Sequence, residues 1–264
     1  MQDRIWRISH GEGPLVAAAV HAGHDLRPEV ARTMALTSGE RLREEDPFTD
    51  QWTIIAGTRI VGLRSRFEMD LNRPPEGAVY QKPEDAWGLD IWHDPPGPRL
   101  LDRSQAEYDA FYDEAGRLLD SKVRQYGTFV VYDLHSYNHR RGGPDAEIDD
   151  PDLNPEVNIG TATMDRERWG PVVDAFIDTL RRHDFMGRKL DVRENVKFFG
   201  GYFSEWIHTT YPTSGCALAI EFKKIFMDEW TGEPDHQSLE AIREALTATT
   251  SPVLEALQAL SLQD

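Results

Sequence analysis

The chain has 264 residues, 39% of them hydrophobic, and its 46 acidic against 29 basic residues give a formal net charge of −17. A chain of this length and composition can bury a sizeable core, so we expect a single domain over residues 1–264. The acid excess repels phosphate backbones and anionic lipid, which argues against nucleic-acid and membrane partners. A site for an acidic substrate must therefore build its own local positive charge.

Cysteine usage and the N-terminal sequence bear on the compartment. The single cysteine, Cys216, excludes an intrachain disulfide and is compatible with a reducing compartment. Residues 1–13 are polar and charged, unlike a signal peptide, and no stretch reaches the roughly 18 apolar residues of a membrane span. These features predict a cytoplasmic protein, whereas the oligomeric state has no signal in the sequence.

Apolar runs and helical patterns alternate along the chain. Five short apolar runs predict buried strands at residues 15–20, 53–61, 128–133, 196–199 and 216–222. A capping box formed by Ser104 and Glu107 predicts the start of one helix. Apolar residues at helical spacing predict a second helix from Trp169 to Leu180, and a third spans about 238–260. Strands that alternate with helices predict an α/β protein with a three-layer α/β/α sandwich.

Two stretches rich in proline and glycine predict long loops, at residues 73–99 and 140–156. Loops of this length inside a compact domain are usually functional or mobile. We therefore expect them to shape the substrate pocket.

Two histidines follow predicted strands. His21 comes directly after the run 15–20, and His135 comes two residues after the run 128–133. Ligands of open α/β sheets bind beyond the carboxyl ends of the strands. A catalytic zinc takes three protein ligands, often imidazoles, and keeps one position open. The pattern predicts one zinc ion per chain at this edge of the sheet.

The third metal ligand has several candidates, among them Asp25 and Glu45. His24 lies three residues after His21, which is a short-range metal-ligand spacing, and Asp46 lies in the acidic run 43–50. The spacing favours His24, and Asp46 is the alternative.

Arginine and amide side chains follow the run 53–61. Arg66, Asn72 and Arg73 offer donors in the geometry that suits a carboxylate. In so acidic a chain, such a group indicates anion capture. The competing interpretation is an ordinary surface ion pair between Arg66 and Asp70 or Glu68.

Glu221 is a carboxylate near the end of the apolar run 216–222. Burial raises the pKa of such a group, which suits a general base that acts on water. The competing interpretation is a strand-edge glutamate paired with Lys223 or Lys224. Gly200 and Gly201 predict a tight turn whose backbone N–H groups could face a substrate oxygen.

Together these residues resemble a known family. The order of the motifs is similar to the zinc carboxypeptidase and aspartoacylase-like superfamily and, more closely, to the N-formylglutamate amidohydrolase family. The resemblance spans roughly residues 20–229. It rests on His-Ala-Gly at 21–23, Asp-Leu-Asn-Arg at 70–73, Asp-Leu-His-Ser at 133–136, Asn-Ile-Gly-Thr at 158–161, Gly-Gly at 200–201 and Ile-Glu-Phe at 220–222.

The resemblance implies a phosphorylase/hydrolase-like α/β/α sandwich with a mixed, mostly parallel sheet. It implies that His21 and His135 are the metal histidines and that Glu221 activates the metal-bound water. The chain departs from the carboxypeptidase pattern His-x-x-Glu, because His24 occupies the position of the glutamate. The resemblance thus leaves open whether His24 or Asp46 completes the metal site.

The resemblance also implies roles in substrate binding. Arg66 corresponds to the arginine that polarises the scissile carbonyl, and Asn72 with Arg73 corresponds to the pair that holds the substrate carboxylate. A side-chain carboxylate would need one more cation, for which Arg140 and Arg141 are candidates. The remaining residues expected to contact substrate are Ser136, Gly200 and Gly201.

The expected partner is a small-molecule N-acyl amino acid, and the expected reaction is zinc-dependent hydrolysis of N-formylglutamate or a related amide. Two alternatives are a carboxypeptidase or other N-acyl-amino-acid deacylase on the same site, and a non-catalytic relative that binds metal or carboxylate. A general base at Glu221 favours an enzyme, because a binding protein has no need of one.

Overall fold

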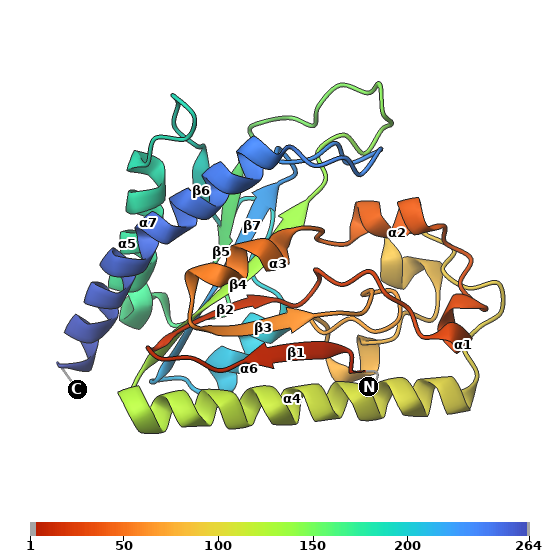
Figure 1. Cartoon of the computed structure of the whole chain (residues 1–264), viewed down its shortest axis with the longest axis horizontal. Helices are drawn as coiled ribbons and strands as arrows, with labels where there is room; N and C mark the ends of the chain where they lie inside the picture. The colour runs from red at the N-terminus through yellow and green to blue at the C-terminus, as the bar shows by residue number, and fades with distance from the viewer. Residues whose placement is uncertain (1–3, 263–264) are drawn as a thin grey trace.

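A computed structural model describes residues 4–262. Within them, seven strands form one sheet in the order β1-β3-β2-β4-β7-β5-β6 (Figure 1). The strands β3, β2, β4 and β7 run parallel, whereas β1 and the β5–β6 pair run antiparallel to them. The strands are β1 (Trp6–Ser9), β2 (Leu15–Ala19), β3 (Thr58–Gly62), β4 (Phe129–Tyr137), β5 (Val157–Gly160), β6 (Val192–Glu194) and β7 (Gly215–Lys223).

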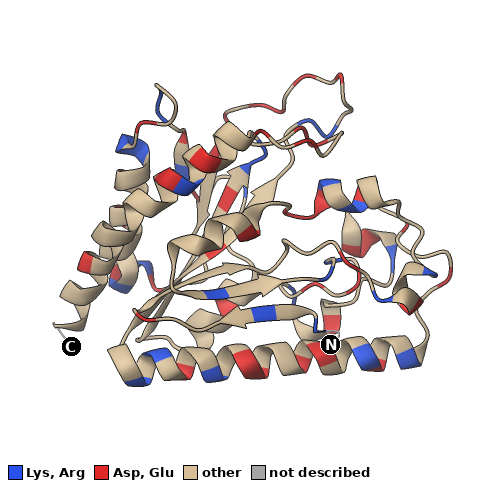
Figure 2. Cartoon of the chain, viewed as in Figure 1, with Lys and Arg blue, Asp and Glu red and all other residues tan. Residues whose placement is uncertain are grey.

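Four long helices flank the sheet, and shorter ones lie in the connections. The long helices are α4 (Pro98–Tyr126), α5 (Arg166–Arg182), α6 (Tyr202–Thr210) and α7 (His236–Ser261). Figure 2 shows charged residues of both signs along α4, α5 and α7 and in the loops. The short elements are α1 (Pro28–Ala31), α2 (Ser38–Glu44), α3 (Thr49–Trp52) and the 3₁₀ turns η1 (Thr53–Ile55), η2 (Pro75–Gly77) and η3 (Pro83–Ala86).

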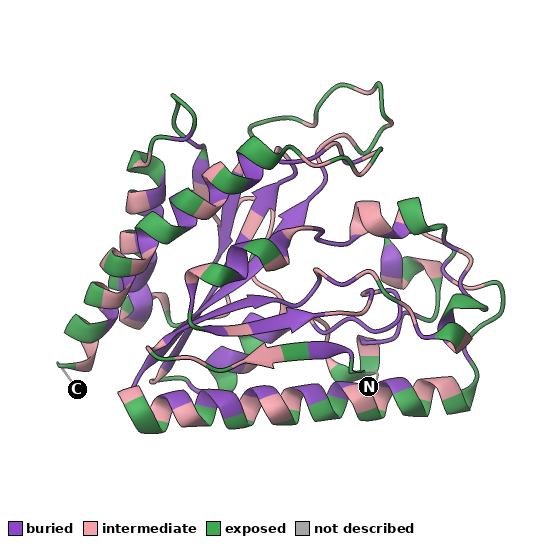
Figure 3. Cartoon of the chain, viewed as in Figure 1, coloured by how far each residue is buried: buried purple, intermediate pink, exposed green. Residues whose placement is uncertain are grey.

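Strand alternation divides the core into two layers. Along β4, Val130 and Tyr132 pack in one cluster with α5 and α7, whereas Phe129 and Val131 pack in the other with α4 and α6. Figure 3 shows the buried residues concentrated in the sheet and on the inner sides of the helices. The structure confirms the predicted α/β/α sandwich with its mixed, mostly parallel sheet.

Two of the five predicted strands need correction. The run 53–61 divides into η1 and the later strand β3. The run 196–199 forms no strand, because the Asn158 side chain satisfies its backbone: it accepts from the amides of Val196 and Lys197 and donates to the carbonyl of Phe198. The Asn158 side chain thus forms the backbone hydrogen bonds that a neighbouring strand would otherwise have formed.

The predicted start of the first long helix is also wrong. Helix α4 begins at Pro98, where the missing N–H of proline costs no hydrogen bond, six residues before Ser104. Ser104 is instead buried inside the helix, and its hydroxyl accepts a 2.5 Å hydrogen bond from Arg27. Cys216 is buried in β7, as expected of a core residue. In residues 4–262, no helix is both long and apolar enough to cross a membrane.

The packing of α5 against the sheet gives a stability prediction. Phe176 is fully buried and meets the Tyr132 ring edge-on, with the ring centroids 5.1 Å apart. Phe176→Ala should lower the free energy of unfolding by about 3–5 kcal/mol, because it leaves a cavity between helix and sheet. Asp178→Ala removes only an exposed ion pair with Arg182 on the same helix and should cost less than about 1 kcal/mol. Urea denaturation measures both, and equal losses would contradict this assignment of the core.

Candidate metal and active site

Three chain segments meet at the carboxyl edge of the parallel strands. His21 lies two residues past β2, and His135 lies near the end of β4, directly opposite Glu221 in the register of β4 with β7. Asp46 lies in the loop after α2, and its amide donates a 3.0 Å hydrogen bond to the carbonyl of His21. This one backbone bond places an acidic residue from a loop against the end of β2.

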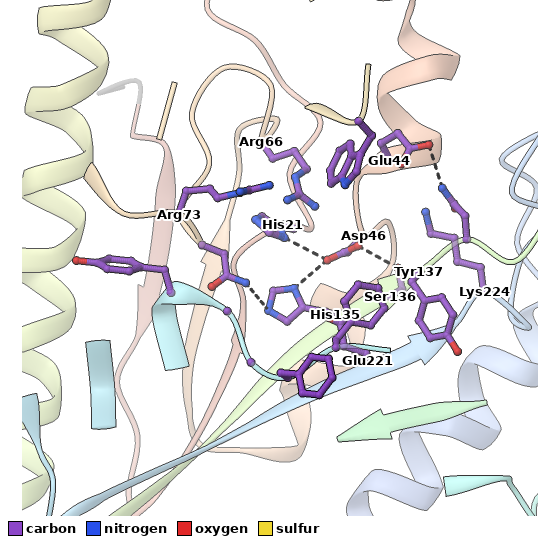
Figure 4. Close-up of a pocket in the computed structure, with 18 of the residues that line it drawn as sticks. His21, Glu44, Asp46, Arg66, Arg73, His135, Ser136, Tyr137, Glu221 and Lys224 are labelled. Carbon is purple, nitrogen blue, oxygen red and sulfur yellow. Dashed lines mark hydrogen bonds and ion pairs between the residues drawn. The ribbon is translucent and has the colours of Figure 1, made fainter. Parts of the chain in front are cut away.

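The side chains of His21, Asp46 and His135 form a buried group (Figure 4). The Asp46 Oδ2 atom lies 3.4 Å from Nδ1 of His21 and 3.0 Å from Nδ1 of His135. One potential ligand atom from each residue lies within 4.8 Å of the others, so the group could hold a metal ion. Two imidazoles and a carboxylate are a donor set that suits zinc and leaves a fourth position open.

His24 lies outside this group. Its Nδ1 lies 2.5 Å from the Glu45 carboxylate, and its Nε2 lies 2.8 Å from the Ser38 hydroxyl. The spacing from His21 favoured His24 as third ligand, but the loop after α2 brings Asp46 to the two histidines instead. The Ser136 hydroxyl donates to the other oxygen of Asp46 at 3.2 Å, which helps to hold that carboxylate in place.

Two further carboxylates hold the far nitrogens of the histidines. Nε2 of His21 lies 2.6 Å from Asp70, and Nε2 of His135 lies 2.9 Å from Asp133. Carboxylates in this position orient metal-binding histidines and leave the other ring nitrogen, here Nδ1, for the metal. From the sequence, Asp70 was considered only as an ion-pair partner of Arg66, and Asp133 was assigned no role at the metal group. The role of Asp133 could have been predicted, because it lies two residues before His135 and residues two apart on a strand point to the same side.

Arg66 is bound to Asp70 inside the site. Its Nη2 donates to Asp70 at 2.7 Å, and its side chain is only 12% exposed. The Tyr80 hydroxyl donates to the same carboxylate. The ion pair considered from the sequence therefore exists, but it is buried, and it fixes Arg66 at the wall of the pocket that contains His21.

The buried charges shift one another's pKa values. Burial works against the charged forms, but Asp133 and Asp46 raise the pKa of His135 well above its usual range. Despite its burial, hydrogen bonds from the two histidines keep the pKa of Asp46 far below its usual range. These carboxylates favour a positive charge among them, which either protons or a metal cation can supply.

Glu221 differs from the other carboxylates. Burial, together with Asp46 and Asp133, raises the pKa of Glu221 to about 8 although His135 acts in the opposite direction. Within residues 4–262 it forms no ion pair with Lys223 or Lys224. It lines the pocket next to His135. A carboxyl group with a raised pKa in this position can exchange protons with a bound molecule near neutral pH.

The pocket that contains the metal group has a volume of about 420 Å³. Asn72 lies on one side, with its amide nitrogen 3.4 Å from Nε2 of His135, and Arg73 and the turn at Gly200 and Gly201 line the same wall. A Cβ at residue 201 would lie 2.3 Å from the Asn72 side chain, so any other residue there would displace that side chain. The predicted substrate-binding residues are thus brought together.

Arg140 and Arg141, the two candidates for binding a side-chain carboxylate, point to different places. Arg140 turns away to Asp228, at 2.7 Å. Arg141 lines the pocket, pairs with Glu44 at 2.9 Å and packs on Trp87, with 5.9 Å between its guanidinium carbon and the ring centroid. Trp87 packs on Arg66 as well, at 5.0 Å. Trp87 could not be predicted as a pocket residue, because it lies in the long loop 73–99 and reaches the site only through folding.

An α/β sandwich that gathers two histidines and several carboxylates beyond the ends of its parallel strands has the arrangement of a hydrolase. The family model for N-formylglutamate amidohydrolase matches residues 13–227. The chain belongs to the N-formylglutamate amidohydrolase family. No match was found among curated protein sequences.

Two solved structures share the fold. An N-formylglutamate amidohydrolase from Ralstonia eutropha JMP134 is similar with a TM-score of 0.73 and 16% sequence identity, over 98% of this chain and 99% of that one. A gene product from Agrobacterium tumefaciens is similar with a TM-score of 0.63 and 17% identity, over 99% of this chain and 97% of that one. At these identities the likeness concerns the fold.

The carboxylate behind His135 gives a test of the metal site. Asp133→Asn should lower zinc affinity by about 10–100-fold, because the amide no longer fixes the ring so that Nδ1 faces the metal. Asp50→Asn, close to Asp46 in sequence but outside the His–Asp–His group, is the matched control and should leave the affinity unchanged. Competition with a fluorescent zinc chelator measures both values. Equal affinities of the Asp133→Asn and wild-type proteins would contradict the proposed role of Asp133.

The raised pKa of Glu221 predicts how the metal-free protein responds to pH. A free glutamate has a pKa of about 4.3 in an unfolded chain, so a folded value near 8 means that the neutral acid stabilises the fold. This contribution is complete below the unfolded pKa and is lost as pH rises through about 8. The melting temperature of metal-free wild type should therefore fall relative to that of Glu221→Gln between pH 5 and pH 9. Parallel pH curves would contradict the raised pKa.

Proposed function

We propose that this protein is a zinc-dependent amide hydrolase that acts on N-formylglutamate or a related N-acyl amino acid. The observation that carries the proposal is the position of Glu221, a carboxyl group of raised pKa directly beside a buried group that could hold a metal. One zinc ion per chain would be held by His21, Asp46 and His135.

Zinc in this group would act as a Lewis acid and lower the pKa of water at its open position. Glu221 takes a proton from the water that attacks the amide carbonyl. The same carboxyl group then delivers a proton to the nitrogen of the departing amine. A pKa near neutrality suits both transfers, because the group must first accept a proton and then give it up.

Arg66 and the neighbouring donors stabilise and orient the substrate. Arg66, held by Asp70, places a fixed positive charge at the pocket wall for the oxygen that becomes negative as the carbonyl is attacked. Asn72 and Arg73 bind the carboxylate of the amino acid. Ser136 acts indirectly, through its hydrogen bond to Asp46. Backbone N–H groups at Gly200 and Gly201 offer further contacts at the same wall.

With N-formylglutamate as substrate, the products are formate and glutamate. A deacylase for a larger N-acyl amino acid is the second candidate, because the pocket extends past the metal group and has a volume of about 420 Å³. It would use the same zinc ligands and the same general base.

A formate-release assay on zinc-loaded protein tests the proposal. Wild type should hydrolyse N-formylglutamate and lose activity to a chelator. Glu221→Gln should keep its zinc but lose about 10²–10⁴-fold in kcat, because the amide cannot transfer the proton. Glu244→Gln, on the exposed side of α7, is the control and should behave as wild type. A Glu221→Gln protein with full activity would refute the role of Glu221 as the base.

A further inference from the structure

The pocket gathers five cationic side chains in a strongly acidic protein, and their pairing is unequal. Arg66 is paired with Asp70. Two others share one carboxylate, Glu44, at distances of 3.9 Å and 2.9 Å. In residues 4–262, neither of the remaining two cations has a carboxylate at salt-bridge distance. The five cations are Arg43, Arg66, Arg73, Arg141 and Lys224. Arg43 and Arg141 share Glu44, and the two without a carboxylate at salt-bridge distance are Arg73 and Lys224.

Lys224 is an unusual cation because it is buried, with 1% of its surface exposed. Its ammonium donates to the backbone carbonyls of Arg43, at 2.5 Å, and Glu45, at 2.8 Å. An ammonium group has three hydrogens, so one remains for a further acceptor. The backbone amide of Lys224 bonds to the Tyr137 carbonyl at 3.0 Å, which fixes the residue at the pocket wall just beyond β7.

A buried charge without a counter-ion is costly, and protein interiors usually supply a partner. The carbonyls orient the Lys224 ammonium, and the nearby carboxylates Asp46, Glu44 and Glu229 act on it only from beyond salt-bridge distance. A carboxylate brought by a ligand would pair with it directly. Lys224 therefore has the properties of an anion-binding residue whose partner belongs to the substrate.

The two cations without carboxylate partners lie on opposite sides of the metal group. Arg73 follows Asn72, which contacts His135. Lys224 is bound to the carbonyl of Glu45, the residue before Asp46. Figure 4 shows Arg73 and Lys224 on either side of the three metal-group residues. A substrate that satisfies both must carry negative charge at both ends.

We infer that Lys224 is the specificity-determining residue of this pocket, which binds a second carboxylate when the N-acyl amino acid carries one. This inference rests on the proposed function. The α-carboxylate binds at Arg73 and Asn72, and the second carboxylate forms a charge-assisted hydrogen bond with the Lys224 ammonium. It comes either from the amino-acid side chain, as in N-formylglutamate, or from the acyl chain, as in N-succinylalanine.

Two pairs of ligands separate these sources. N-formylglutamate against N-formylglutamine changes only the side-chain charge, and N-succinylalanine against N-butyrylalanine changes the end of the acyl chain. Calorimetry measures their binding to zinc-loaded Glu221→Gln protein, in which turnover is suppressed. The same titrations are made with Lys224→Met added to that variant. Lys223→Met is the control, because it removes the adjacent ammonium, which interacts with Glu156 and Asp191 instead.

The dicarboxylic member of one pair should bind about 10–100-fold more tightly than its monocarboxylic partner, and Lys224→Met should abolish that preference while Lys223→Met preserves it. The pair that responds identifies the source of the carboxylate. Absence of a preference in both pairs, before any change at Lys224, would overturn the inference even if Lys224→Met failed to fold. A preference that survives in folded Lys224→Met protein would overturn it too.

Turnover distinguishes this inference from the proposed function. If wild type releases formate from N-formylglutamate but neither pair is discriminated through Lys224, the inference fails and the proposed function stands. If the dicarboxylic ligands bind through Lys224 but wild type hydrolyses none of the four compounds, the proposed function fails and the carboxylate site stands.

Discussion

Four carboxylates converge on two buried imidazoles, and this concentration of negative charge constrains the rest of the site. Asp46 lies between His21 and His135, and two other aspartates hold the outer nitrogens of the rings. Glu221 completes the set from β7. Such a cluster is stable only if positive charge enters it. The parallel pairing of β2, β4 and β7 creates the demand for a cation by bringing these strand ends together.

The same arrangement divides the carboxyl groups by their chemistry. Despite their burial, Asp46 and Asp70 have lowered pKa values, because the histidines and, for Asp70, Arg66 stabilise their ionised forms. Within residues 4–262 Glu221 forms no ion pair, and burial raises its pKa instead. Similar side chains only a few ångströms apart are thereby prepared for different tasks: holding a cation, and moving a proton.

The sequence predicts the parts of this site that are local and misses the parts that depend on tertiary contacts. His21, His135 and Glu221 could be found because each adjoins an apolar run that forms a strand. The choice of Asp46 over His24 could not, because it depends on a hydrogen bond between a loop and the end of β2. The fold shows the same division: the central strands were predictable, whereas the apolar run 196–199 is not a strand because an asparagine side chain binds its backbone.

The most direct test is the zinc affinity of Asp46→Ala against His24→Ala, measured with the wild-type protein in the same chelator competition. We predict one zinc ion per wild-type chain and little change in zinc affinity for His24→Ala. For Asp46→Ala we predict a loss of affinity larger than the ~10–100-fold expected when a carboxylate that only orients a ligand, such as Asp133, is removed. Loss of zinc in His24→Ala with retention in Asp46→Ala would contradict the ligand set. Absence of stoichiometric zinc in wild type, even after zinc is added, would contradict the metal site itself.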